Sequence, residues 1–167
     1  KPIFITLGRL SVEKDHAKLI KAFAEVVNQY PESKLLILGD GYLRLELMAL
    51  INEFRLNDNI FLMGHINNPY PWLAKADCFV LSSNHEGQPM VLLEAMALNR
   101  PIIATDIPAT RGMLMNSSAK LVENSIKGLA TGLLEACREM PKPVEIDFNK
   151  YNKHCVEQFY HISKIPY

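Results

Sequence analysis

The chain has 167 residues, of which 49% are hydrophobic and 22% are charged, so it is long enough to bury one sizeable core. This composition excludes an intrinsically disordered, collagen-like or coiled-coil protein. Basic and acidic residues number 18 each, so the formal charge is zero and gives no field that would hold nucleic acid. The apolar runs are far shorter than the roughly 20 residues that cross a bilayer.

The three cysteines, Cys78, Cys137 and Cys155, lie far apart and contain no CxxC pair. Their spacing argues against a disulfide framework or a zinc site and favours ordinary thiols in a reducing compartment. The chain opens at Lys1 without a signal-peptide pattern and enters a strand-like run at once. We therefore expect a cytoplasmic protein without a metal site, and we expect these residues to be a piece of a longer chain.

Short apolar runs alternate with segments of helical periodicity, which is the pattern of a parallel sheet with helices on both faces. Strands are expected at residues 3–7, 34–38, 60–63, 78–81, 102–105 and 119–122. Helices are expected from Asp15, as N-cap residue, to Pro31, and at residues 43–54, 70–74, 90–97 and 126–140. The apolar face of the first helix is predicted to hold Ile20, Phe23, Ala24 and Val27.

The predicted fold is an α/β, Rossmann-like, doubly wound parallel sheet of about six strands. The usual strand order 3-2-1-4-5-6 places the first and fourth strands side by side where the winding reverses, and ligands bind beyond their carboxyl ends. We expect residues 1–148 to form this domain. Residues 149–167 are expected to form a separate helix, with Val156, Phe159 and Tyr160 on its apolar side.

Two cations follow the first strand, in a turn that begins at Gly8. Arg9 offers a planar fork suited to phosphate and Lys14 a compact point charge, so together they could neutralise a diphosphate without metal. The alternative is two solvated surface cations.

Two carboxylates follow the fourth strand. Gly87 allows close approach of a ligand to the backbone, and Pro89 suits the first helical position, so the next amides could form an anion site. Glu94 lies inside an otherwise apolar helix, where an unpaired buried charge would cost several kcal/mol. We therefore expect a polar group to meet Glu94, unless it points to solvent. Glu86 alone could be a loop charge.

The sequence resembles the C-terminal domain of group 1 retaining glycosyltransferases of the GT-B fold. The resemblance covers nearly the whole chain. It rests on Gly8-Arg9 followed by Lys14, on Gly39-Asp40-Gly41, on Phe61-Leu62-Met63-Gly64-His65, and on Glu86-Gly-x-Pro-x-x-x-x-Glu94-Ala-Met-Ala.

This resemblance implies a nucleotide-sugar donor site, for a UDP-, GDP- or ADP-sugar, and transfer with retained stereochemistry. By matching positions, Arg9 and Lys14 hold the diphosphate and stabilise the leaving group, so no metal is required. Glu94 accepts hydrogen bonds from the ribose hydroxyls. Glu86 lies beside the transferred sugar and favours positive charge at its anomeric carbon, but is not assigned as a nucleophile.

The resemblance also implies backbone contacts to the donor. The amides of Gln88, Met90 and Val91 face phosphate or sugar, and the backbone near His65 and Ile66 borders the base. The glycines Gly39 and Gly41 form either a strand-to-helix turn or a loop that lines the donor cleft.

The resemblance further implies a partner domain, because an N-terminal domain holds the acceptor in this fold. The helix at residues 149–167 would return to that domain, or pack on this domain's own sheet. The acceptor would be a cell-surface polysaccharide or a glycolipid, with peripheral contact at the inner face of the membrane in the longer protein. The isolated piece is expected to bind nucleotide weakly and to transfer nothing.

The sequence departs from the family pattern at three places. Pro89 stands where a glycine is more common, a change that the N-terminus of a helix tolerates well. Asn99 stands where a glycine is common, and Ala109-Thr110 stands where a Gly-Gly pair is common, so no sugar contact is assigned to the loop from Asp106 to Gly112. His85 has no second ligand at useful spacing, so we expect a structural role for it.

Three other functions remain open. A nucleotide-sugar epimerase or a phosphorylase of the same fold would share the phosphate site. A non-catalytic nucleotide-binding module is the third alternative, because fold alone does not determine function. A dehydrogenase is disfavoured because no Gly-x-Gly-x-x-Gly follows the first strand.

Overall fold

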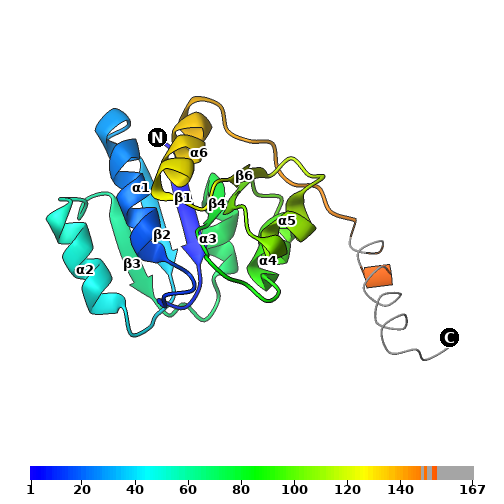
Figure 1. Ribbon diagram of the computed structural model, residues 1–167, viewed down its shortest axis with the longest axis horizontal. Helices are drawn as coiled ribbons and strands as arrows, with labels where there is room; N and C mark the ends of the chain where they lie inside the picture. Colours follow the sequence, from blue (N-terminus) through cyan, green and yellow to red (C-terminus); the bar gives the residue numbers. More distant parts are fainter. Residues whose placement is uncertain (148, 150–151, 154–167) are drawn as a thin grey trace.

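Six parallel strands form one sheet in the order β3-β2-β1-β4-β5-β6. The computed structural model describes residues 1–147, 149, 152 and 153 (Figure 1). The predicted α/β fold and strand order are confirmed, and β1 pairs with β4 at the reversal of the winding. The elements are β1 (Ile3–Leu7), α1 (His16–Gln29), β2 (Lys34–Leu38), α2 (Arg44–Glu53), β3 (Ile60–Gly64), α3 (Tyr70–Lys75), β4 (Cys78–Leu81), α4 (Met90–Ala97), β5 (Ile102–Thr105), α5 (Pro108–Leu114), β6 (Lys120–Val122) and α6 (Ile126–Arg138).

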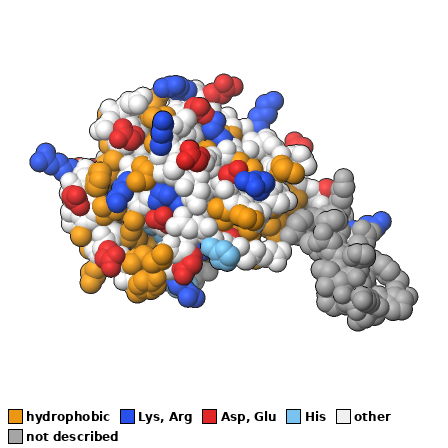
Figure 2. Space-filling model, viewed as in Figure 1, with side chains coloured by type: hydrophobic (Ala, Val, Ile, Leu, Met, Phe, Trp, Pro, Cys, Tyr) orange, Lys and Arg blue, Asp and Glu red, His pale blue; other side chains and the backbone are white. Residues whose placement is uncertain are grey.

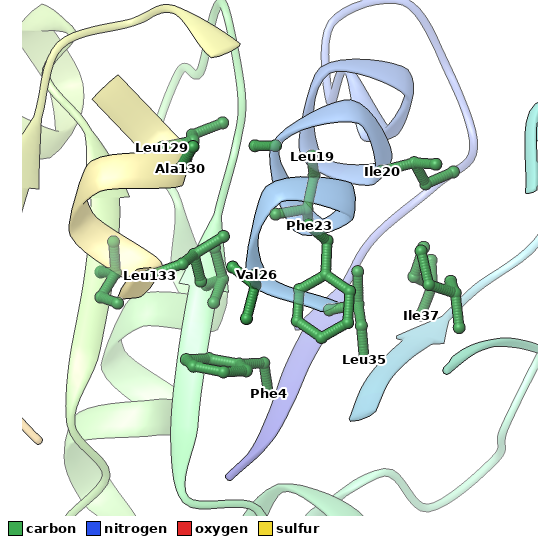
Figure 3. Packing of buried hydrophobic residues seen from close by; sticks show 14 of the residues in the cluster. Phe4, Leu19, Ile20, Phe23, Val26, Leu35, Ile37, Leu129, Ala130 and Leu133 are labelled. Atoms are coloured by element: carbon green, nitrogen blue, oxygen red, sulfur yellow. The ribbon is translucent and has the colours of Figure 1, made fainter. Parts of the chain in front are cut away.

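The helices cover both faces of the sheet. Buried residues of α1, α2 and α6 form one apolar cluster, and those of α3, α4 and α5 form another on the opposite face. Phe4 of β1 belongs to the first cluster and its neighbour Ile5 to the second, because successive side chains of a strand point to opposite faces. In Figure 3, Phe4 lies beneath Phe23 of α1, with ring centroids 5.8 Å apart in an edge-to-face contact. Burial on both faces explains why the strands are continuous apolar runs.

The predicted face of α1 is only partly correct. Ile20 and Phe23 are fully buried, whereas Ala24 and Val27 are half-buried at the margin of the cluster. The reason is that α1 packs against both the sheet and α6, which lies beside it (Figure 1). This second contact turns the buried stripe of α1 away from the face that periodicity alone predicts.

Two residues with left-handed backbone conformation lie at helix ends: one at the start of α1 and one just after α4. Asp15 has φ 45° and is the N-cap of α1, as predicted, because its side chain accepts a hydrogen bond from the Lys18 amide at 3.0 Å. Asn99 has φ 55° just after α4, and its amide donates to the Met96 carbonyl at 2.9 Å. Asparagine tolerates this conformation better than most residues, which explains how it replaces glycine here.

The loops after β1 and β2 touch each other through glycine. A Cβ atom added to Gly39, which has φ 139°, would lie 1.9 Å from the Gly8 carbonyl oxygen. A Cβ atom on Gly41 would lie 2.4 Å from the carbonyl oxygen of Leu10. Both glycines are therefore required for the close approach of these two loops.

The expected loop from Asp106 to Gly112 is wrong, because most of it belongs to α5. The Thr110 hydroxyl is buried; it donates to the Thr105 carbonyl at 2.5 Å and accepts from the Ile107 amide at 3.1 Å. These bonds fix the first turn of α5, so Thr110 has a structural role. The helix predicted at residues 149–167, with Val156, Phe159 and Tyr160, lies outside the described residues.

Candidate functional site

Four charged side chains predicted to act together line one cleft at the carboxyl ends of β1 and β4. The cleft has a volume of about 370 Å³, and its charged lining residues are Arg9, Lys14, Glu86 and Glu94. The first two come from the loop between β1 and α1, at residues 8–15, and the last two from residues 82–97 after β4. The strand order therefore brings together cations and carboxylates that lie more than 70 positions apart, as Lys14 and Glu86 do.

A second cleft adjoins the first, since Leu7, Gly8 and Arg9 line both. It has a volume of about 330 Å³. Its remaining lining residues are Leu38, Gly39, Asp40, His65, Ile66 and Pro69. The loop of Gly39 is thus both a tight turn and part of a cleft wall, so the two interpretations of Gly39-Asp40-Gly41 are compatible. Of the two glycines, Gly39 lines this cleft, whereas Gly41 lies against the backbone of Leu10.

Lys14 and Glu86 form an ion pair across the cleft. The Nζ atom of Lys14 lies 2.5 Å from Oε1 of Glu86, and the Ser83 hydroxyl donates to the same oxygen at 2.6 Å. The side chains are 22% and 9% exposed, so water screens this pair less than it would a surface pair. An anion that binds to Lys14 must compete with Glu86.

Glu94 lies half-buried in α4 and lines the cleft with Arg9. Within the described part of the chain it forms no ion pair, so the polar partner expected from the sequence is not a cation of these residues. Arg9 is exposed. The hydrogen bond from Ser11 holds the pKa of the Glu13 carboxylate below its usual range, and the positive charge of Arg9 acts in the same direction.

The start of α4 differs from the expected geometry. Pro89 is the N-cap residue and is buried, so Met90 is the first helical residue. The Met90 amide donates to the Gln88 carbonyl at 2.9 Å, so it is already bonded within the chain. Gln88, Met90 and Val91 nevertheless line the cleft. Gly87 is exposed, and a Cβ atom there would meet nothing within 4 Å.

A buried lysine beside this site was not singled out in the sequence. Lys18 is 8% exposed and donates to the side chains of Asn84 and Asn124. Burial lowers the pKa of the Lys18 ammonium group, and the nearby Asp15 carboxylate acts in the opposite direction. No local pattern in the sequence marks Lys18, because its asparagine partners lie 66 and 106 positions away in the chain.

His85 and the cysteines form no candidate metal site among the described residues. His85 is exposed, and no group of three histidine, cysteine or acidic side chains among the described residues could hold a metal ion. Cys78 is buried, which raises the pKa of its thiol, and it and Cys137 are free thiols. In the part of the chain that the structure describes, no helix has the length and apolar character needed to span a membrane.

Comparisons with known proteins identify the family of the chain. The family model for glycosyl transferases group 1 matches residues 1–153. The chain belongs to this family. Figure 2 shows basic and acidic side chains interspersed over one face of the molecule, in agreement with its net charge of zero.

Three relatives illustrate the similarity. A glycosyltransferase of Methanocaldococcus jannaschii is 45% identical over 104 residues, covering 62% of this chain and 26% of the relative. The N-acetylgalactosamine-N,N'-diacetylbacillosaminyl-diphospho-undecaprenol 4-alpha-N-acetylgalactosaminyltransferase of Campylobacter jejuni is 41% identical over 102 residues, covering 61% and 27%. Among solved structures, a mutant of S. aureus TarM in complex with fondaparinux, alpha-GlcNAc-glycerol and UDP has a TM-score of 0.78 and 27% identity, covering 84% and 29%. The chain thus spans between a quarter and a third of each relative.

Proposed function

We propose that this glycosyltransferase chain is the donor-binding domain of a retaining enzyme that transfers a sugar from a nucleotide-sugar. The observation that carries the proposal is the single cleft that joins Arg9 and Lys14 to Glu86 and Glu94 where the winding of the sheet reverses. Ligands of doubly wound sheets bind at this point.

Arg9 and Lys14 are the groups that we propose for the donor diphosphate. Both line the cleft from the loop after β1, and the Arg9 side chain is exposed. Two cations can neutralise the charge that develops on a departing nucleoside diphosphate, so they take the role that a metal ion has in other transferases.

The carboxylates are proposed to bind hydroxyl groups. Glu94 would accept hydrogen bonds from the ribose. Glu86, released from Lys14 by the diphosphate, would orient hydroxyls of the transferred sugar and favour positive charge at its anomeric carbon. The base would occupy the adjoining cleft of His65 and Ile66, with uridine favoured because UDP is present in the TarM complex.

The acceptor is proposed to be a glycolipid or cell-surface polysaccharide, held mainly by an N-terminal domain. The name of the Campylobacter jejuni relative, which specifies a diphospho-undecaprenol acceptor, supports this class. The chain spans 27% of that relative, which leaves room for a second domain in a longer protein. Such a protein would work in the cytoplasm, at the inner face of the membrane, and the isolated chain would bind donor without transferring sugar.

Calorimetric titration tests this function. The chain is titrated with UDP, GDP, ADP and their sugar conjugates without added metal. We expect selective binding of the uridine compounds, lost in Arg9→Ala and Glu94→Ala. The matched controls are Arg138→Ala and Glu25→Ala, which replace exposed side chains of α6 and α1. Absence of binding to every nucleotide, even at high concentration, or equal binding by all variants, would contradict the proposal.

The longer protein distinguishes the rival functions. Incubation with the donor alone should release little nucleotide until an acceptor is supplied. Isomerisation of the donor sugar without acceptor would instead indicate an epimerase, and cleavage that requires inorganic phosphate would indicate a phosphorylase.

A further inference from the structure

Lys18 places a buried positive charge beside the candidate donor site. It is the third residue of α1, and its side chain is 8% exposed. Its Nζ atom donates to Oδ1 of Asn84 at 2.5 Å and to Oδ1 of Asn124, and lies 3.3 Å from Oδ2 of Asp15. An ammonium group has three N–H donors, so three acceptors satisfy it completely.

A lysine at this position is unfavourable on local grounds. Burial of an ammonium group costs free energy, and the positive end of a helix dipole disfavours a cation in the first turn. Lys18 lies near the N-terminal ends of two helices. It is in the first turn of α1, and its partner Asn124 directly precedes Ser125, the N-cap residue of α6, which packs beside α1 (Figure 1). An apolar side chain would avoid both costs. Residues that conflict with their local surroundings are expected where function requires them.

The hydrogen bonds of Lys18 lead directly to the loop that carries Glu86. Asn84 lies two positions before Glu86 and accepts from Lys18. Its Nδ2 atom donates to Asp15 at 2.9 Å, and its backbone amide donates to the Glu13 carbonyl at 2.8 Å. Asn84 is therefore held on its side chain and on its backbone by the residues next to Lys14.

A neighbouring bond continues this connection. The Ser82 hydroxyl donates to the Lys14 carbonyl at 2.8 Å, and the Lys14 side chain itself pairs with Glu86. Residues 82–86 and 13–18 thus form one hydrogen-bonded unit, and Lys18 is its buried cation. Asn124 extends the unit to the loop after β6.

We propose that Lys18 is a positioning residue of the donor site: its ammonium group, through Asn84, holds the loop of Glu86 against the loop of Lys14 before the donor binds. Such preorganisation lowers the ordering cost that the ligand would otherwise meet. The benefit to the donor rests on the proposed function. The hold on the loop is a property of the chain alone, so it can be tested without a ligand.

Amide hydrogen exchange tests the hold on the loop. Lys18→Met removes the charge and keeps the length of the side chain. We expect the amide of Asn84, which donates to the Glu13 carbonyl, to exchange about tenfold faster, while the amides of the central strands, which report on global unfolding, change less. Lys21→Met, on the exposed side of the same helix, should change neither. Unchanged exchange of the loop in folded Lys18→Met would overturn the inference.

Asn84→Ala tests the same link from the other side and does not alter the buried position. It should accelerate amide exchange in the loop to a similar extent. The double variant should exchange little faster than either single variant, because both substitutions remove the same contact between Lys18 and Asn84. Additive effects of the two substitutions would contradict the proposal. This variant also decides the question if Lys18→Met does not fold.

Binding of UDP and a UDP-sugar then tests the benefit to the donor. We expect the dissociation constant of the UDP-sugar to rise about tenfold in Lys18→Met and to stay unchanged in Lys21→Met. Equal binding by wild type and Lys18→Met would overturn the inference and leave the proposed function intact. If wild type binds no nucleotide, the proposed function and the inferred benefit to the donor both fail, and loop exchange separately decides whether Lys18 holds the loop.

Discussion

The Nζ atom of Lys14 lies 2.5 Å from Oε1 of Glu86, although the two residues are 72 positions apart in the chain. This pair joins the loops that follow β1 and β4, the two strands between which the winding reverses. Because the Glu86 carboxylate is paired with the Lys14 ammonium group, an anion must displace the carboxylate to bind Lys14.

Removal of the Glu86 charge should strengthen the binding of UDP alone. In Glu86→Gln, Lys14 no longer has a competing carboxylate, so we expect the dissociation constant of UDP to fall roughly threefold, as for a partly exposed ion pair. Calorimetry measures this, with Glu25→Gln as a control for the change in net charge. Weaker binding of UDP by Glu86→Gln would show that the carboxylate does not compete with the diphosphate.

Removal of either cation should slow transfer by the longer protein. Arg9→Met and Lys14→Met each delete a charge that we propose to stabilise the leaving diphosphate, so kcat should fall by a factor corresponding to about 3 kcal/mol. The measurement is the steady-state release of UDP in the presence of acceptor. Arg138→Met serves as the control, and unchanged turnover in the cleft variants would refute the assigned role.

Acid should destabilise the fold through His16. This side chain is 2% exposed, and its Nδ1 atom has no hydrogen-bond partner among the described residues. Burial, assisted by the charge of Lys14, lowers the pKa of His16 from 6.5 to about 4. The unfolded chain therefore binds more protons between these values, and stability is lost as the pH falls from 6.5 towards 4.

Replacement of His16 should remove this part of the pH dependence. The contribution has an upper limit of about 3 kcal/mol between neutral pH and the folded pKa. Urea unfolding at several pH values should therefore give a shallower loss of stability for His16→Phe than for wild type. His65→Gln, at an exposed position, should follow the wild-type profile. Parallel profiles for wild type and His16→Phe would show that His16 is not the group responsible.

Gly39→Ala should be strongly destabilising. The added methyl group would clash with the Gly8 carbonyl in a backbone conformation that favours glycine, so we expect a loss of about 3 kcal/mol in the free energy of unfolding. Gly112→Ala is the matched control, because a Cβ atom there meets nothing within 4 Å and alanine favours a helix. Similar stabilities of the two variants would contradict this account of the loop contact.

The sequence predicts most of the architecture, for reasons that lie in burial. All four residues of both β4 and β5 are buried, so each is a continuous apolar run that is easily recognised. Helix α5 was missed because it has only seven residues, begins at Pro108 and contains Gly112, features that also characterise loops.

The site was predictable where its residues occur in a local motif, and less so where distant residues meet. Arg9 and Glu94 each belong to a recognisable segment. The contacts of Lys18 with Asn84 and Asn124 span 66 and 106 positions, so no spacing in the sequence reveals them. Helical periodicity does not distinguish Lys18 from Lys21, the exposed lysine of α1. Its side chain is buried because three loops pack around it.

Chemical-shift mapping of the isotope-labelled chain with UDP, without metal, tests the central claim most directly. The account predicts that perturbed amides gather around Gly8 to Lys14 and Glu86 to Glu94, the two walls of the cleft at the carboxyl ends of β1 and β4. A larger cavity of about 570 Å³ lies elsewhere, between β6 and α6, and is lined by Lys120 and Arg138 among others. Perturbations confined to that cavity, or none at saturating UDP, would contradict the assignment of the donor site.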